Sequence, residues 1–510
     1  MAEAPIARIT GGIVQGDRQD DINCFKGIRY GADTGGANRF RPPQPVEPWE
    51  GVRLADAFGP DSPQSDPDKP ARASDAAVQV LGIEGEDCLR ANVWTPSMNG
   101  KRPVLVWLHG GGFVSGSGSG IIYDGTRLAR RGDVVVITLN HRLGALGYMN
   151  LEGFVQSDEP LVNLGMLDIV AALRWVQDNV AAFGGDPGNV TVFGESGGGR
   201  KVSTLLAMPD ARGLFHRGVI QSGPAVFMND ADASKDVTRR ILEEAGETAP
   251  TLASLQAMPL ERLMKAQLRV LSQVAREEQP GLAQPLAAVV DGTILPNHPF
   301  DPEAPSISDD IPVMIGWNQT EATLWLGRDP DLNEVSDERL ATRITSLVGD
   351  RAREFIANYR QHYPEANNSD LLAYIATGRR RYPLDSLVLA ERKAQRAGAP
   401  VWLYTLRYRT TARRGALRTP HALEIPFVFD NVDTSRRFVG DGEGPQAMAE
   451  QMSECWLAFA RGSDPNHPGI PHWPAYDPIR RESMLFDVES TIATDYGRVE
   501  RETFGKLYYP

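Results

Sequence analysis

The sequence Gly-Glu-Ser-Gly-Gly at residues 194–198 is the feature that most constrains how this chain folds. It follows an apolar, β-branched run at 190–193 and precedes a stretch compatible with a helix. A G-x-S-x-G pattern in this position predicts a sharp turn from strand to helix that exposes the serine. The outer glycines fit such a turn because neighbouring chain comes too close for a Cβ atom. Ser196 is therefore a candidate nucleophile.

A second glycine-rich segment lies upstream, where an apolar run at 104–108 leads into His-Gly-Gly-Gly-Phe at 109–113. Glycines leave backbone N–H groups accessible, and each N–H aimed at an oxyanion lowers a reaction barrier by about 3 kcal/mol. We predict that the N–H groups of Gly111, Gly112 and Gly197 form an oxyanion hole. A tight turn that needs positive φ is the alternative. His109 precedes the donors and is expected to support the loop.

Length and composition place these motifs in a large globular body. The chain has 510 residues, of which 41% are apolar and 23% charged. Five apolar runs are candidate strands: 104–108, 134–139, 190–193, 311–315 and 401–408. Helix-like segments alternate with them, the clearest at 163–183 with Asn163 as N-cap. We expect an α/β fold, a large and mostly parallel central sheet flanked by helices, in a single domain over residues 1–510.

Charge and hydropathy exclude several classes of partner. A formal net charge of −13 argues against nucleic acid, which needs a basic surface. No apolar run reaches the roughly 18 residues of a membrane span, and the N-terminus lacks the pattern of a signal peptide. The expectation is a soluble protein, monomer or dimer, cytoplasmic, or periplasmic or secreted if a signal peptide was removed. Its three cysteines show neither metal-ligand spacing nor a disulfide framework.

Further motifs converge on one family. They are Phe-Lys-Gly-Ile-Arg-Tyr at 25–30, Glu-Asp-Cys-Leu at 86–89, Asn-Val-Trp-Thr-Pro at 92–96, Phe-Gly-Gly-Asp-Pro at 183–187 and Gln-Ser-Gly at 221–223. With the serine turn and the glycine loop, they resemble the type-B carboxylesterases, relatives of the cholinesterases, over nearly the whole chain. The resemblance implies an α/β-hydrolase fold, a Ser-Glu-His triad in that chain order and no metal or organic cofactor.

Two departures from the family pattern are informative. Ser62 stands where many eukaryotic members have a cysteine that pairs with the one at Cys88, so that disulfide is absent and a bacterial member is indicated. The usual alanine after the nucleophile is Gly197, which keeps the N–H donor and is expected to make the turn more flexible. Glu195 is expected to brace the turn, and Ser222 to hydrogen-bond near the triad acid.

The acid of the triad is assigned from the segment at 315–321, which resembles the family's G-x-N-x-x-E pattern. Glu321 is the candidate, although Thr320 and Ala322 differ from the usual neighbours. Asp291 and Asp301 compete for the role, but Asp291 precedes a glycine and is expected to shape a turn.

The base is selected from eight histidines by chain order. In this fold the histidine follows the last major strand, here expected at 401–408. Three histidines then remain: His421, His467 and His472. The sequence around His421 resembles the family's histidine loop, whereas the other two lie among prolines. His421 is therefore the predicted base.

Substrate contacts are less constrained. Insertions near 230–275 and 336–396 look helical and amphipathic, and we expect them to form the walls of a substrate gorge. Arg200 and Lys201 begin the helix after Ser196, where the helix dipole disfavours each cation by roughly 0.3 to 1 kcal/mol. Either ion pairs compensate or these side chains receive an anionic part of the substrate. The same choice applies to the arginines at 379–381, of which Arg380 is the candidate.

The predicted activity is that of a serine carboxylesterase acting through an acyl-enzyme. If the basic residues line the pocket, esters with free carboxylates become candidate substrates, such as the tricarballylic esters of fumonisins that some bacterial relatives hydrolyse. An amidase or peptidase using the same triad is an alternative. A non-catalytic, adhesion-like member of the fold is a second alternative, but it would be expected to lack the serine or histidine and to carry a membrane anchor.

Overall fold

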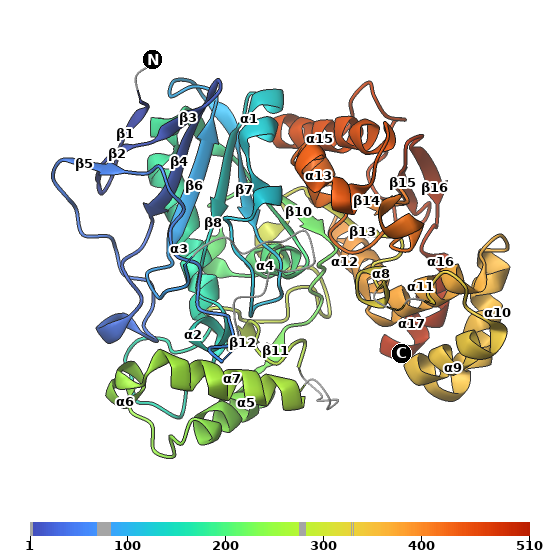
Figure 1. The fold of residues 1–510 in the computed structure, drawn as a ribbon, viewed down its shortest axis with the longest axis horizontal. Helices are drawn as coiled ribbons and strands as arrows, with labels where there is room; N and C mark the ends of the chain where they lie inside the picture. Colours follow the sequence, from blue (N-terminus) through green and yellow to red (C-terminus); the bar gives the residue numbers. More distant parts are fainter. Residues whose placement is uncertain (1–3, 69–82, 275–281, 328, 330, 510) are drawn as a thin grey trace. The chain divides into compact units, whose positions relative to one another are not determined.

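The computed structural model describes residues 4–68, 83–274, 282–327, 329 and 331–509 (Figure 1). The chain divides into two compact units. Unit 1 comprises Met1–Gly218 and Ala225–Ser308, and unit 2 comprises Val219–Pro224 and Asp309–Pro510. The expectation of a single domain over residues 1–510 stays a prediction.

The main sheet strands of unit 1 run in the order β9-β7-β8-β6-β4-β3. Their bounds are β3 Asp17–Gln19, β4 Ile22–Arg29, β6 Arg90–Thr95, β7 Arg102–Leu108, β8 Val135–Leu139 and β9 Gly185–Glu195. Strand β7 is parallel to β8 and β9, whereas β8, β6, β4 and β3 pair antiparallel in succession. This part of the sheet therefore contains both parallel and antiparallel pairs, because short connections such as the one from β3 to β4 can join only antiparallel neighbours.

Helices and two minor sheets complete unit 1. The helices are α1 Thr126–Gly132, α2 Gly144–Tyr148, α3 Leu164–Asn179, α4 Gly197–Leu205, α5 Ala231–Glu244, α6 Leu252–Ala257 and α7 Leu260–Val274. The minor strands are β1 Ile6–Ile9, β2 Gly12–Gln15, β5 Val52–Leu54, β11 Asn229–Asp230 and β12 Val289–Val290. Strands β1, β2 and β5 form one sheet, and β11 pairs with β12.

The predicted strands of unit 1 are confirmed by β7, β8 and β9. Every side chain from Val104 to Leu108 in β7, and every one in β8, is buried. Such continuous apolar runs are typical of strands that are covered on both faces. Leu108 pairs with Gly194 in the parallel register of β7 and β9. The two glycine-rich segments therefore start side by side at the carboxyl edge of the sheet.

The predicted helix at 163–183 is α3, followed by a short 3-10 turn at Val180–Phe183. Asn163 stands at its N-cap position but does not cap it, so that part of the prediction is wrong. Its backbone is left-handed, with φ 57°. The side-chain amide instead pairs with the backbone of Val289: Oδ1 accepts from the Val289 N–H at 2.7 Å and Nδ2 donates to its carbonyl at 2.8 Å.

Unit 2 contains the strand order β16-β15-β14-β13-β10. Their bounds are β10 Arg217–Gln221, β13 Val313–Asn318, β14 Val401–Leu406, β15 Glu482–Phe486 and β16 Thr491–Thr494; β10 begins in unit 1 and ends in unit 2. Strands β13, β14 and β15 are parallel, and β16 runs antiparallel at the edge. Strands β13 and β14 are buried throughout and confirm the last two predicted strands.

The segment 336–396 is helical, as expected. It comprises α9 Asp337–Val348, α10 Ala352–His362, α11 Asn368–Arg379 and α12 Tyr382–Gln395. The remaining helices of unit 2 are α8 Thr323–Leu326, α13 Ile425–Val428, α14 Arg436–Val439, α15 Gly444–Gly462, α16 Arg498–Thr503 and α17 Gly505–Tyr508. A hydrophobic cluster that includes Phe355, Tyr359, Leu371 and Phe504 packs α10, α11 and the C-terminal segment together. A gorge-forming role for these helices stays a prediction.

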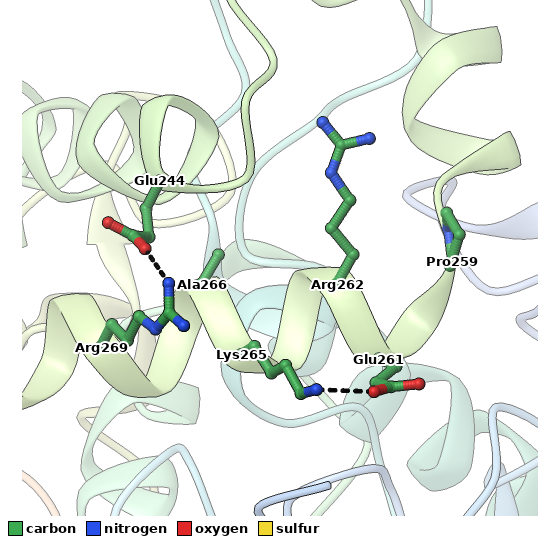
Figure 2. A pocket seen from close by; sticks show the side chains of 7 residues that line it. All are labelled: Glu244, Pro259, Glu261, Arg262, Lys265, Ala266 and Arg269. Atoms are coloured by element: carbon green, nitrogen blue, oxygen red, sulfur yellow. Dashed lines mark hydrogen bonds and ion pairs between the residues drawn. The ribbon is translucent and has the colours of Figure 1, made fainter. Parts of the chain in front are cut away.

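The other predicted insertion, 230–275, forms α5, α6 and α7; residue 275 lies outside the described residues. A surface hollow of about 310 Å³ lies along α7, where Lys265 pairs with Glu261 at 2.7 Å and Arg269 with Glu244 at 2.6 Å. Figure 2 shows the side chains that line it. None of the predicted site residues lines this hollow, and its charges are largely paired within it.

Two further observations concern the whole described chain. No helix within the described residues is both long and apolar enough to cross a membrane. All three cysteines, Cys24, Cys88 and Cys455, lie in described segments and are free and buried. Burial raises the pKa of the Cys88 thiol to about 12, so this thiol is an inert core group.

Candidate active site

Ser196 lies at a sharp turn between β9 and α4. Its backbone adopts φ 56° and ψ −119°, a sparsely populated region for a residue with a side chain. A Cβ atom on Gly198 would lie 1.9 Å from the Leu108 carbonyl oxygen, and one on Gly194 would lie 2.6 Å from the Gly198 backbone. The flanking glycines are therefore required by close backbone approach. The serine side chain stays partly exposed, as a nucleophile must.

The glycine loop at 109–113 packs directly on this turn. A Cβ atom on Gly197 would lie only 2.0 Å from the Gly112 carbonyl oxygen. This contact explains the glycine that stands where the family usually has alanine. The sequence suggested a more flexible turn, whereas the structure shows a closer approach between the loop and the helix.

Each predicted oxyanion donor is the N–H of a peptide group whose carbonyl oxygen accepts a hydrogen bond within the protein. In a trans peptide the N–H points opposite to the preceding carbonyl, so fixing the carbonyl also aims the N–H. The Gly110 carbonyl accepts from His109 Nδ1 at 2.8 Å, which aims the Gly111 N–H. The Gly111 carbonyl accepts from the N–H and Oγ of Ser115, both at 3.1 Å, which aims the Gly112 N–H.

The third donor is held by the helix itself. The Ser196 carbonyl accepts the first helical hydrogen bond, from the Arg200 N–H at 3.0 Å, which directs the Gly197 N–H. Donors arranged before reaction cost no reorganisation when negative charge develops. The roles of Gly111, Gly112 and Gly197 stay predictions, and the backbone geometry is suited to them.

His109 serves the loop, as expected. It is buried and stacks on His141, with ring centroids 5.0 Å apart. Burial, and secondly the charge of Lys201, lower the pKa of His109 to about 3. The ring is therefore neutral, and Nδ1 carries the hydrogen that it donates to the Gly110 carbonyl.

Lys201 is placed differently from the prediction. Its side chain is fully buried, and Nζ donates to the His109 carbonyl at 3.1 Å. A side chain buried in this way is not available to receive an anionic substrate, so that part of the prediction is corrected. The physical reason is the turn of α4: the fifth helical residue points toward the glycine loop, whereas Arg200 is only half-buried.

Glu321 and His421 are brought together in unit 2. Glu321 follows β13 and His421 follows β14, and these strands are parallel neighbours with Asn318 opposite Leu406. His421 Nδ1 donates to Glu321 Oε2 at 2.6 Å, and both side chains are buried. A buried carboxylate on Nδ1 fixes the imidazole tautomer and leaves Nε2 as the proton acceptor.

Local backbone bonds hold this pair. Glu321 Oε1 accepts from the Asn318 N–H at 2.7 Å, and the His421 N–H donates to the Glu321 carbonyl at 3.2 Å. Thr320 Oγ1 accepts from the Thr419 N–H at 2.8 Å. Thr320, a departure from the family pattern, thus ties the acid segment to the histidine segment.

A second buried carboxyl was missed from the sequence. Glu424 Oε2 accepts from Asn318 Nδ2 at 2.6 Å, and Oε1 accepts from Ser222 Oγ at 3.4 Å. Burial, and secondly the charge of Glu321, raise the pKa of Glu424 to about 7. The hydrogen bond expected of Ser222 near the predicted acid is thus made to Glu424. The only indication of this carboxyl in the sequence is that Glu424 lies three residues after His421.

Aromatic rings pack against the imidazole. The centroids of Trp325 and Tyr382 lie 5.1 and 4.9 Å from that of His421. The guanidinium of Arg380 lies 3.7 Å from the Trp325 ring centroid. Trp325 is 41% exposed and Arg380 is exposed, so this arginine is presented at the surface beside the predicted base. Neither ring was predicted from the sequence.

The neighbouring arginines have structural contacts. Arg379 Nη1 donates to the Tyr508 hydroxyl at 2.8 Å, and Arg381 pairs with Asp385 at 2.9 Å. By contrast, no carboxylate among the described residues forms an ion pair with Arg380 or Arg200. Arg379 and Arg381 therefore have structural contacts, and Arg380 is the exposed cation of the three.

The competing residues have other contacts. Asp291 accepts hydrogen bonds from the backbone of Ile294 and Leu295, as expected for a turn. His467 bonds to the backbone of Gln451 and Gly469. No group of three or more histidine, cysteine or acidic side chains in the described segments could hold a metal ion.

Comparison with known proteins supplies the family. The carboxylesterase family matches residues 3–504. The para-nitrobenzyl esterase of Bacillus subtilis is 35% identical over 495 residues, which cover 95% of each chain. The fumonisin B1 esterase of Sphingopyxis macrogoltabida is 32% identical, over 92% of this chain and 84% of that one.

A solved structure agrees with these sequences. The carboxylesterase EST55 of Geobacillus stearothermophilus, at pH 6.2, is 36% identical and superposes with a TM-score of 0.81 over 98% of this chain and 99% of that one. The fold is therefore the α/β-hydrolase fold that the sequence predicted. The chain belongs to the carboxylesterase family and is a carboxylic ester hydrolase of the bacterial type.

Proposed function

We propose that Ser196, His421 and Glu321 act as nucleophile, base and acid in the hydrolysis of carboxylic esters. His421 Nε2 accepts the Ser196 hydroxyl proton as the oxygen attacks the ester carbonyl, and Glu321 stabilises the imidazolium. The Gly111, Gly112 and Gly197 N–H groups stabilise the oxyanion. His421 then gives the proton to the leaving alcohol, and water hydrolyses the acyl-enzyme by the same steps.

The observation that carries this proposal is the buried 2.6 Å bond from His421 Nδ1 to Glu321 Oε2, in a chain whose Ser196 sits at a strained turn. Ser196→Ala removes the nucleophile without adding bulk. We expect kcat for a 4-nitrophenyl ester to fall by roughly 10⁶-fold with an unchanged melting temperature. Labelling of Ser196 by a fluorophosphonate, located by mass spectrometry, is the direct check. Near-normal turnover by a folded Ser196→Ala enzyme would place the nucleophile elsewhere.

The amidase alternative is tested with the same enzyme. Triad chemistry accommodates both esters and amides, so the comparison needs a 4-nitrophenyl ester and a 4-nitroanilide with one acyl group. Faster turnover of the anilide would favour the amidase or peptidase.

We further propose that the preferred esters carry a free carboxylate, with the tricarballylic esters of fumonisins as one candidate class. The support is the exposed Arg380 guanidinium, which stacks on Trp325 beside His421 and has no ion pair among the described residues. Arg200, half-buried on the helix that starts at Ser196, is a second candidate contact. One relative is named a fumonisin B1 esterase, which is consistent with this class.

Charge reversal tests the anionic preference. We expect Arg380→Glu to lower kcat/KM for a 4-nitrophenyl hemisuccinate by about tenfold, because a partly exposed ion pair contributes about 1 kcal/mol and its reversal adds repulsion. The neutral 4-nitrophenyl butyrate should change by less than about twofold. Arg353→Glu, the same change at an exposed position of α10, is the matched control. Equal losses on both esters would reject the proposal.

A further inference from the structure

Lys201 is a buried cation that the mechanism above does not use. It lies five residues after Ser196 in α4, and its side chain is fully buried. No carboxylate in the described part of the chain forms an ion pair with it, and burial lowers the pKa of its ammonium to about 7. Taking an ammonium out of water without an anionic partner is unfavourable. The contacts of Nζ indicate which interaction compensates for this cost.

Lys201 contacts both ends of the glycine loop. Nζ donates to the carbonyl of His109, the first loop residue, at 3.1 Å. It also lies 5.6 Å from the ring centroid of Phe113, the last loop residue. The hydrogen bond links residues 92 positions apart in the sequence. One side chain thus ties the loop to the helix that begins at Ser196.

The His109 carbonyl is the first of two consecutive carbonyls held by side chains. Lys201 holds the His109 carbonyl, and His109 Nδ1 holds the Gly110 carbonyl at 2.8 Å. Because N–H and carbonyl point opposite ways across each trans peptide, these two bonds set the directions of the Gly110 and Gly111 N–H groups. The second bond depends on the first, since a displaced His109 backbone would carry its ring with it.

We propose that Lys201 is a positioning residue that holds the 109–113 loop against the nucleophile helix, so that the Gly111 N–H is aimed before the oxyanion develops. The inference rests on the esterase mechanism proposed above. Both the ammonium and the neutral amine donate to a carbonyl, so the hydrogen bond persists across the working pH range. His109 and His141 are the titratable neighbours: burial, and secondly the Lys201 charge, lower the pKa of each ring, and both rings are neutral.

The test removes the donor while keeping the shape. Lys201→Met replaces the ammonium by an apolar group of similar length. We expect kcat for 4-nitrophenyl butyrate to fall about 10-fold to 100-fold with KM within about twofold, because misplaced donors weaken only the transition state. The melting temperature should change little, since removal of the desolvation cost of the ammonium offsets the loss of its hydrogen bond to the His109 carbonyl. Lys201→Arg, which restores N–H donors, should recover part of kcat.

Lys393 provides a matched control. It is also buried, donates from Nζ to a backbone carbonyl, that of Asp309 at 3.3 Å, and has its pKa lowered to about 8 by burial. It lies in α12 of unit 2, outside the proposed machinery. We expect Lys393→Met to keep kcat within about twofold whatever it does to the melting temperature.

The outcomes separate this inference from the proposed function. A folded Lys201→Met enzyme with wild-type kcat would overturn the inference, as would a kcat loss that Lys393→Met reproduces. If Lys201→Met does not fold, Lys201→Leu is the second donor-free variant, judged in the same way. The rate of Ser196 labelling by a fluorophosphonate should fall in parallel with kcat. Loss of wild-type labelling at Ser196 would instead reject the proposed mechanism.

Discussion

At the scale of single residues, the glycines around Ser196 have distinct physical reasons. Gly194 and Gly198 are needed because backbone atoms lie within 3 Å of the position of a Cβ. Gly197 is needed for another contact, with the Gly112 carbonyl. The sequence pattern predicts the first two, since every serine turn of this kind requires them. The third depends on how this particular loop packs.

Gly197→Ala tests that contact. The new Cβ would lie 2.0 Å from the Gly112 carbonyl oxygen, so the loop must move. We expect kcat to fall about 10-fold to 100-fold with little change in KM, because an error of about 1 Å in donor position costs about 100-fold. The melting temperature should fall as well, because backbone atoms must give way and the helix preference of alanine over glycine, about 1 kcal/mol, offsets only part of that strain. Steady-state kinetics with active-site titration measures kcat and KM.

Gly462→Ala is the control for this substitution. Gly462 ends α15, and nothing lies within 4 Å of a Cβ built there. Its alanine variant should keep wild-type kcat. A Gly197→Ala enzyme as fast as the control would show that the loop yields without disturbing the donors.

At the scale of elements, parallel pairing places the site. Strands β7 and β9 end together in unit 1, as do β13 and β14 in unit 2. The loops that carry chemistry therefore follow the carboxyl ends of strands, where side chains are free of the sheet. The helix packing of unit 2 also buries a carboxyl group with a raised pKa, Glu500 of α16.

Glu500 makes the packing of α16 on α10 sensitive to pH. Tyr359 donates to Oε1 at 3.3 Å, whereas Oε2 is buried without a hydrogen-bond donor in the described structure. Burial raises the pKa of Glu500 from 4.5 to about 7. Between these values the folded state holds a proton that the unfolded state has lost. Stability therefore declines as pH rises from about 4.5 to 7, and the cost persists above pH 7.

Glu500→Gln removes this cost because the amide is neutral at every pH. We expect the stability advantage of the variant over the wild type to be small at pH 4.5, to grow up to about pH 7 and to stay constant above it, reaching on the order of 3 kcal/mol. Melting temperatures measured at several pH values check this trend. Glu502→Gln is the control: its carboxylate pairs with Arg498 at 2.7 Å, so no growing advantage is expected. A pH-independent difference for Glu500→Gln would contradict the assignment.

At the scale of the whole molecule, net charge affects which ligands approach, and chain order affects which residues are candidates for the triad. The net charge of −13 disfavours anionic ligands at long range, so a carboxylate-bearing ester would depend on local cations such as Arg380. The triad candidates come from both compact units, Ser196 from unit 1 and Glu321 and His421 from unit 2. Their order along the chain was readable because the fold connects its strands in a fixed sequence.

The sequence by itself determined the parts that depend on local backbone chemistry and chain order. These are the strained serine turn, the glycine loop, the buried strands, the turn at Asp291 and the reduction of the candidate bases to three late histidines. Each is a property of a few neighbouring residues, or of the succession of strands, and needs no knowledge of packing.

Only the tertiary structure decided which distant groups meet. It turned Lys201 toward the His109 carbonyl, directed Asn163 to Val289 instead of its own helix, and buried Glu424 beside Asn318. It also placed Trp325 and Tyr382 against His421. These contacts join segments tens to hundreds of residues apart. Their energies depend on burial and orientation, which no local pattern of residue types encodes.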